Sequence, residues 1–259
     1  MVVEALYFIV WLIILSWGAD RFVFGASALA KNIGISPMII GLTIVAMGSS
    51  APEIMVAATA SLNGNTDTAV GNAIGSNITN IALVLGLTAL FKPLKIASAT
   101  LKREMPVLLL VSILATYLLS DLFLSRGEGI LLIILFFAVI GGLTWMAFNM
   151  EKDDPLQKET ESEIPSNVPT KKAVIWLLVG LILLPLSAHF MVDSAVIIAR
   201  HFGLSDLVIG LTIIAIGTSL PELAASIAGV LKNEDDLALG NIIGSNIFNL
   251  LAVMAMPGL

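Results

Sequence analysis

The sequence has no cysteine and little charge. Without cysteine there is no disulfide framework, no thiolate metal site and no cysteine nucleophile. Only 12% of the 259 residues are charged and 58% are hydrophobic, which is too apolar for a soluble domain of this length. The 13 Lys and Arg residues form no basic patch, so no nucleic-acid partner is expected. These absences leave an integral membrane protein as the expected class.

Long apolar runs occupy most of the chain. A run of about 20 apolar residues can cross a membrane as a helix, whereas barrel strands are shorter and alternate in polarity. We therefore predict an all-α integral membrane protein, surrounded by the lipid bilayer. The eight predicted spans are residues 2–28, 37–62, 68–91, 105–121, 127–149, 172–199, 205–231 and 236–257.

Positive charge is unequally divided between the two ends of these spans. With the N-terminus outside, eleven Lys and Arg residues lie on the inner side, and only Arg126 and Arg200 lie outside. Short positively charged loops stay in the cytoplasm. We therefore predict a multi-pass protein of the cell (inner) membrane with its N-terminus outside. Residues 151–171, with six acids and three prolines, are predicted to form a flexible cytoplasmic linker.

Two motifs recur at a constant offset on either side of this linker. GLTIVAMGSSAPE ends at Glu53 and GLTIIAIGTSLPE ends at Glu222, an offset of 169 residues (222 minus 53). We assign residues 1–150 to a first repeat and residues 172–259 to a second. Because five predicted helices separate equivalent positions, the second copy is inverted. Inverted repeats with Gly- and Pro-interrupted helices are typical of secondary transporters, whose binding site lies between the repeats.

Each motif places a carboxylate inside an apolar helix, where a charge costs at least about 2.5 kcal/mol. Glu53 and Glu222 could instead form a structural pair or a protonated relay. Because both lie in symmetric motifs interrupted by proline, we favour them as partners at one cation site. Because proline has no backbone N–H, Pro52 is expected to free carbonyls near Ala46 to Gly48 for a ligand, and Pro221 those of Ala215 to Gly217.

Hydroxyl groups accompany both glutamates. They stand four and three residues before each carboxylate, a spacing that places them on its helical face. These hydroxyls belong to Ser49, Ser50, Thr218 and Ser219. Carboxylates, hydroxyls and carbonyls are hard ligands that suit Ca²⁺, Na⁺ or Mg²⁺, and the reluctance of Mg²⁺ to lose water favours Ca²⁺ and Na⁺. We expect these ions as substrates and no cofactor.

A second polar stripe lies on the helices that follow each motif. Its residues step by four and therefore share one helical face: Asn72, Ser76 and Asn80, with Asn241, Ser245 and Asn249 as equivalents. For Asn72 and Asn241, hydrogen bonding between helices is as good an explanation as ion ligation. Gly71 and Gly75 form a pair of small residues that allows another helix to approach. Asp20, His189 and Asp193 are expected to have interfacial or gating roles.

In its paired G[ST]S.PE and GN.IGSN...N elements, the chain resembles the Ca²⁺/cation antiporter superfamily, specifically its prokaryotic Na⁺/Ca²⁺ exchanger-like members. The resemblance implies an inverted-repeat bundle in which helices 2–28 and 172–199 slide across four binding helices during alternating access. It implies Ca²⁺ ligation by Glu53, Glu222 and carbonyls near Ala46 and Ala215. By the same resemblance, Na⁺ would use these glutamates and the side chains of Ser49, Ser50, Thr218, Ser219, Ser76, Ser245, Asn80 and Asn249.

The chain departs from this family pattern in two places. Potassium-dependent exchangers carry an acid at the position of Asn249, so the amide argues, by resemblance, against potassium coupling. About ten helices are expected, but the chain ends at Leu259, after the third helix of the second repeat. We therefore expect the second repeat to be incomplete and to lack roughly 60 residues, two helices.

The leading functional hypothesis is antiport of Na⁺ against Ca²⁺. One alternative is Ca²⁺/H⁺ exchange, in which the two glutamates load protons. A passive cation channel is less consistent with inverted repeats. An intramembrane hydrolase would need Ser50 and His189 as nucleophile and base, but hydroxyls beside a glutamate in both repeats fit ion ligation better, so we expect no enzyme.

Overall fold

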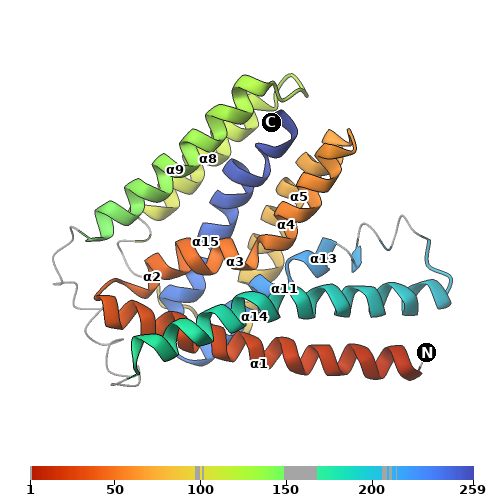
Figure 1. The fold of residues 1–259 in the computed structure, drawn as a ribbon. Helices are drawn as coiled ribbons and strands as arrows, with labels where there is room; N and C mark the ends of the chain where they lie inside the picture. Colours follow the sequence, from red (N-terminus) through yellow and green to blue (C-terminus); the bar gives the residue numbers. More distant parts are fainter. Residues whose placement is uncertain are drawn as a thin grey trace.

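The regular structure of the described residues is entirely helical. The computed structural model describes residues 2–96, 100, 102–148, 168–205, 209, 212–213 and 215–259 (Figure 1). In these ranges, five helices are long and apolar enough to cross a membrane: Val2–Ile33, Thr66–Phe91, Arg126–Met146, Thr170–His201 and Asp235–Gly258. Pro37–Ser49 and Ala51–Leu62, bent by 47° at their junction, form a sixth candidate span. The all-α membrane class is thus confirmed.

Two of the eight predicted spans fall on shorter helices. Residues 105–121 correspond to α8 (Glu104–Leu118), and residues 205–231 contain α14 (Leu220–Leu231). The number of crossings therefore stays a prediction. Residues 151–167 of the predicted linker lie outside the described residues, and its last two residues already belong to helix α11 (Thr170–His201).

Helices α1 (Val2–Ile33) and α11 form a long antiparallel pair along one side of the molecule (Figure 1). Each has 32 residues, about 48 Å at 1.5 Å per residue. Because this length exceeds the membrane core of about 30 Å, both helices are expected to tilt. Glycines bring them together: a Cβ on Gly25 would lie 2.5 Å from the backbone nitrogen of Leu177, and one on Gly180 would lie 2.3 Å from Cβ of Phe22.

Apart from α8 and α9 (Arg126–Phe148), the other helices of each repeat form a core beside this pair. In the first repeat they are α2 (Pro37–Ile40), η1 (Gly41–Val45), α3 (Ala46–Ser49), α4 (Ala51–Leu62), α5 (Thr66–Thr79), η2 (Asn80–Leu85) and α6 (Gly86–Phe91). In the second they are α13 (Ala215–Thr218), α14, α15 (Asp235–Phe248), η4 (Asn249–Val253) and η5 (Met256–Gly258). Helices α8 and α9 pack on η4, and Phe136 of α9 meets Phe248, the last residue of α15, edge to face.

The repeat is visible in backbone conformation as well as in sequence. Gly34 and its equivalent Gly203 both have positive φ, 71° and 79°. Gly64 and Asn233 also correspond, with φ of 74° and 61°. The wide π-helical turns at 41–45 and 80–85 recur at Thr212 and Ile213 and at 249–253. Equivalent sequence therefore produces equivalent local geometry in both halves. The domain boundaries at residues 150 and 172 stay a prediction.

Candidate cation site

Both glutamate motifs contain a helix break. In the first, α3 ends at Ser49 and α4 begins at Ala51, because Ser50 leaves helical geometry with φ −83° and ψ 13°. Its equivalent Ser219 has φ −90° and ψ 5°. The prolines stand in the first turn of the helix after each break, where a missing N–H is tolerated. Each glutamate is thereby held in the first turn of a new helix.

The carbonyl of Ala46 keeps a backbone hydrogen bond: it accepts the Ser50 N–H at 3.0 Å, and the Ser49 hydroxyl lies 3.3 Å away. Ligation of a cation by this carbonyl stays a prediction. The break lies beyond the Ser50 N–H, so that group still reaches back four residues. The carbonyl that Pro52 cannot serve is that of Gly48, four residues before it. Ala215 is the first residue of α13, and its side chain lies outside the described residues.

Glu53 and Glu222 lie in the interior, with side chains 1% and 0% exposed. They are close enough to repel each other through space. In each carboxylate, Oε2 has no hydrogen-bond partner among the described residues. Two like charges in a dry interior are unfavourable unless a proton or a cation compensates them.

One hydroxyl of each motif binds the carboxylate of the opposite motif. Ser50 donates to Oε1 of Glu222 at 2.8 Å, and the Thr218 hydroxyl hydrogen-bonds the Glu53 side chain. The spacing in sequence pairs Ser50 with Glu53, but the helix breaks at Ser50 and its hydroxyl binds the glutamate of the other repeat. The crossed pairing joins the two repeats into one site.

The polar stripe on α5 and α15 lies against the same carboxylates. Ser76 donates to Oε1 of Glu53 at 3.4 Å, and the Ser245 hydroxyl lies 3.4 Å from the Ser49 hydroxyl. Asn72 and Asn241 of the stripe hold helices together. Asn72 donates to the Glu53 backbone carbonyl at 3.1 Å, and Asn241 donates to that of Glu222 at 3.3 Å. These hydrogen bonds are the contacts expected if Asn72 and Asn241 join helices, and ion ligation by either side chain stays a prediction.

Asparagines form a second polar cluster beside the carboxylates. Asn80 donates to Oδ1 of Asn246 at 3.2 Å, and Asn77 donates to the Asn246 backbone carbonyl at 3.1 Å. Asn77 and Asn246 are equivalent positions, so this contact joins the two repeats. They were not among the predicted site residues, although their recurrence at the repeat offset was a signal. Both side-chain polar atoms of Asn249, which is fully buried, have no partner among the described residues.

Five oxygen atoms of the predicted ligands are buried without a hydrogen-bond partner among the described residues. A buried polar atom without a hydrogen bond is uncommon and costs stability, so a group of them indicates a missing ligand. Those among the predicted ligands are Glu53 Oε2, Glu222 Oε2, Ser219 Oγ, Asn80 Oδ1 and Asn249 Oδ1. The described part of the chain has no group of three or more His, Cys, Asp and Glu that could hold a metal. A cation here would depend on two carboxylates and neutral oxygens, a set that suits Na⁺ and Ca²⁺.

The polar residues of the long helices lie apart from these oxygens. His189 has a side chain that is 67% exposed, and it pairs with Asp193 at 3.5 Å. Asp20 pairs with Lys232 at 2.7 Å. Because Ser50 donates to a buried glutamate and His189 faces outward, the two do not form a nucleophile and base. The interfacial or gating roles expected of Asp20, His189 and Asp193 stay a prediction.

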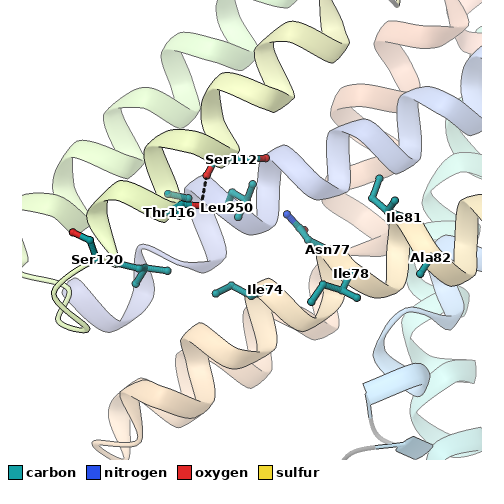
Figure 2. Close-up of a pocket in the computed structure, with 11 residues that line it drawn as sticks. Ile74, Asn77, Ile78, Ile81, Ala82, Ser112, Thr116, Ser120 and Leu250 are labelled. Atoms are coloured by element: carbon teal, nitrogen blue, oxygen red, sulfur yellow. Dashed lines mark hydrogen bonds between the residues drawn. The ribbon is translucent and has the colours of Figure 1, made fainter.

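A groove of about 720 Å³ lies beside the asparagine cluster, between α5, η2 and α8 (Figure 2). Its wall is mostly apolar, with Ile74, Ile78 and Ile81 on one side and the hydroxyls of α8 on the other. Asn77 lines the groove and also belongs to the cluster. The carboxylates do not line it, so the groove is separate from the candidate site.

The comparison with known families agrees with this arrangement. Residues 3–145 and 172–259 match the family described as sodium/calcium exchanger protein. The chain belongs to this family.

Several relatives of the exchanger family match nearly the whole chain. A protein named putative antiporter CaxA, from Alkalimonas amylolytica, is 59% identical over 99% of this chain and 80% of its own length. Inner membrane protein YrbG from Escherichia coli is 46% identical over 100% of this chain and 80% of its own length. Sodium/calcium exchanger MaX1 from Methanosarcina acetivorans is 30% identical over 99% of this chain and 83% of its own length.

The solved structure of the sodium-calcium exchanger NCX_Mj superposes with a TM-score of 0.85 at 36% identity, covering 100% of this chain and 82% of that one. The exchanger fold inferred from the repeated motifs is thus confirmed. The family consists of transporters, so the expectation that the chain is no enzyme is also confirmed.

Proposed function

We propose that this chain exchanges Na⁺ for Ca²⁺ by alternating access, at a site between Glu53 and Glu222. The observation that carries the proposal is the crossed arrangement of the two motifs. Each inverted repeat supplies one buried carboxylate and one hydroxyl that binds the carboxylate of the other repeat. Neither repeat has the site alone. Names of similar proteins support the choice of ions, since one relative is named a sodium/calcium exchanger.

The charge of the site explains why transport would be an exchange. Two carboxylates balance one Ca²⁺ or two Na⁺, so either load neutralises the site. An empty site would leave two like charges in the apolar interior, which is costly. Crossing the membrane without a cation is therefore unfavourable, and each inward or outward movement needs a load. This couples the flow of one ion to the opposite flow of the other.

The long helices provide a unit that can move relative to the site. The glycine contacts between α1 and α11 make the pair compact. Its surface toward the site is apolar: a Cβ on Gly48 would lie 2.6 Å from a methyl carbon of Leu181, and one on Gly217 would lie 2.1 Å from a methyl carbon of Val192. An interface of this kind has few hydrogen bonds to break when one surface slides over the other. In the proposed cycle, this movement opens the site to one side at a time.

The remaining features complete the proposal. Glu53, Glu222 and nearby backbone carbonyls would bind Ca²⁺. Na⁺ would bind through the same carboxylates together with Ser49, Ser50, Thr218, Ser219, Ser76, Ser245, Asn80 and Asn249. The protein would lie in the cell membrane with its N-terminus outside and residues 151–171 in the cytoplasm, in agreement with the distribution of Lys and Arg.

Uptake of ⁴⁵Ca²⁺ into sealed proteoliposomes tests the proposal. Purified protein is reconstituted, and Na⁺, K⁺ or H⁺ gradients are imposed one at a time at a clamped membrane potential. We expect an outward Na⁺ gradient to drive uptake, while a K⁺ gradient does not. Uptake driven by a pH gradient and indifferent to Na⁺ would replace this coupling with Ca²⁺/H⁺ exchange. Uptake that needs no counter-ion would indicate a channel.

A further inference from the structure

The two repeats differ at one buried position beside the site. The residue four positions after the motif glutamate is Ala57 in the first repeat and Ser226 in the second. Both are fully buried. The hydroxyl of Ser226 accepts a hydrogen bond from the side-chain amide of Asn241 at 3.1 Å. Ala57 has no hydroxyl to offer Asn72, so this contact is particular to the second repeat.

Ser226 determines which way the Asn241 amide points. The amide NH₂ group of an asparagine has two hydrogens, and its orientation follows from the acceptors around it. For Asn241 these acceptors are the Ser226 hydroxyl and the Glu222 backbone carbonyl, at 3.1 and 3.3 Å. With both hydrogens directed toward α14, Oδ1 faces α3. There it accepts the hydroxyl of Ser49 at 3.0 Å.

The direction of the Ser49 proton decides what its oxygen can bind. The hydroxyl has one proton and two acceptor lone pairs. Asn241 Oδ1 is nearer to it, at 3.0 Å, than the Ala46 carbonyl, at 3.3 Å. When Asn241 takes the proton, Ser49 has two lone pairs, of which the Ser245 hydroxyl at 3.4 Å can occupy one and a cation beside Glu222 the other. If the amide turned over, its N–H would occupy a lone pair of Ser49 and compete with the cation.

We propose that Ser226 is a positioning residue that sets Na⁺ affinity through Asn241 and Ser49. It contacts no ion itself. The inference rests on the proposed function, which assigns Ser49 to Na⁺, whereas Ca²⁺ uses the carboxylates and carbonyls. Loss of the Ser226 hydroxyl therefore weakens Na⁺ binding more than Ca²⁺ binding.

Ser226→Ala tests this in the proteoliposome assay, with the half-saturating concentration and maximal rate determined separately for each ion. We expect half-saturating Na⁺ to rise about fivefold, the effect of losing one ordinary hydrogen bond. Half-saturating Ca²⁺ and the maximal rate should change less than about twofold. Ser226→Thr keeps the hydroxyl and should restore Na⁺ affinity. Ser61→Ala is the matched control, because the Ser61 hydroxyl bonds only its own helix, at the Ala57 carbonyl, 2.7 Å away.

Three results would overturn the inference. The first is unchanged Na⁺ affinity in Ser226→Ala when the unaltered protein exchanges Na⁺ for Ca²⁺ normally. The second is an equal loss for both ions with a lowered melting temperature and no restoration by Ser226→Thr, which would mean a packing role. The third is an unaltered protein that exchanges no Na⁺ for Ca²⁺, and this result alone would overturn the proposed function as well.

Discussion

Helices Thr66–Phe91 and Asp235–Gly258 carry the same motif in the two repeats, but their surroundings differ. In the most apolar window of each, 22% of the residues are buried in the first helix and 100% in the second. α15 packs against η1 and α2 on one side and against α8 on the other, while α5 borders the open groove of Figure 2. Equivalent sequence therefore produces equivalent backbone geometry without producing equivalent packing.

Small residues show the same difference. A Cβ on Gly240 would lie 2.4 Å from the Met38 carbonyl oxygen, and one on Gly244 would lie 2.5 Å from that of Leu42. At Gly71 and Gly75, no atom in the described part of the chain lies within 4 Å of such a Cβ. The close helix approach predicted at Gly71 and Gly75 is therefore wrong, and it is found instead at their equivalents, Gly240 and Gly244. The carboxylates, in contrast, are equally buried in both repeats.

The sharpest test of equivalence is to remove one carboxylate charge at a time. Glu53→Gln and Glu222→Gln should each abolish Na⁺-driven ⁴⁵Ca²⁺ uptake, because one remaining charge cannot neutralise Ca²⁺. Both variants should still fold, since glutamine preserves size and removes a buried charge. Asp67→Asn, at an exposed acid on α5, should transport normally. Near-normal uptake by either glutamine variant would mean that the site is elsewhere.

Alanine substitutions at equivalent glycines should affect stability differently in the two helices. Gly240→Ala places a methyl group against the Met38 backbone, and we expect it to lower the free energy of unfolding by about 3 kcal/mol. Gly71→Ala meets no described atom and should stay within about 0.5 kcal/mol of the unaltered protein. Thermal unfolding in detergent measures both. Equal losses would show that α5 and α15 are packed alike in solution.

The equivalent motif hydroxyls Ser50 and Ser219 should also contribute differently to the stability of the ion-free protein. Ser50→Ala removes the 2.8 Å hydrogen bond to Glu222 and should cost about 1.5 kcal/mol of stability. Ser219 Oγ has no partner among the described residues, so Ser219→Ala should leave ion-free stability within about 0.5 kcal/mol. Both should weaken Na⁺ binding. Melting curves with and without Na⁺ distinguish the two effects, and a large ion-free loss from Ser219→Ala would contradict the assignment.

The smallest expected effect concerns the ion pair between α1 and the turn after α14. Asp20 and Lys232 correspond to His189 and Asn63 in the other repeat, which cannot form an equivalent ion pair. The two side chains are 43% and 31% exposed, so a double-mutant cycle of Asp20→Asn and Lys232→Gln should give a coupling of about 0.5 kcal/mol. The cycle on His189→Ala and Asn63→Ala should give none. A coupling above about 2 kcal/mol would indicate a much drier contact.

Much of the site could be predicted because buried charge is costly. Glu53 and Glu222 were identifiable since only a compensating partner makes a carboxylate acceptable in an apolar helix. The place of Asn80 and Asn249 as equivalent residues of the polar stripe followed from the repeat offset. The bond from Ser50 to Glu222 was missed because helical spacing was extended through a break. The backbone hydrogen bond of the Ala46 carbonyl was missed because the Ser50 N–H lies before the break and still reaches it.

The sequence by itself determined the membrane class, the repeat, its inversion and the two carboxylates, because these depend on composition, spacing and the cost of charge in an apolar helix. Only the tertiary structure decided that Ser50 and Thr218 each bind the glutamate of the opposite repeat, and that α15 is enclosed while α5 borders a groove. These features depend on which helices meet across the repeats. Local spacing cannot specify such contacts, because the same motif accepts different neighbours.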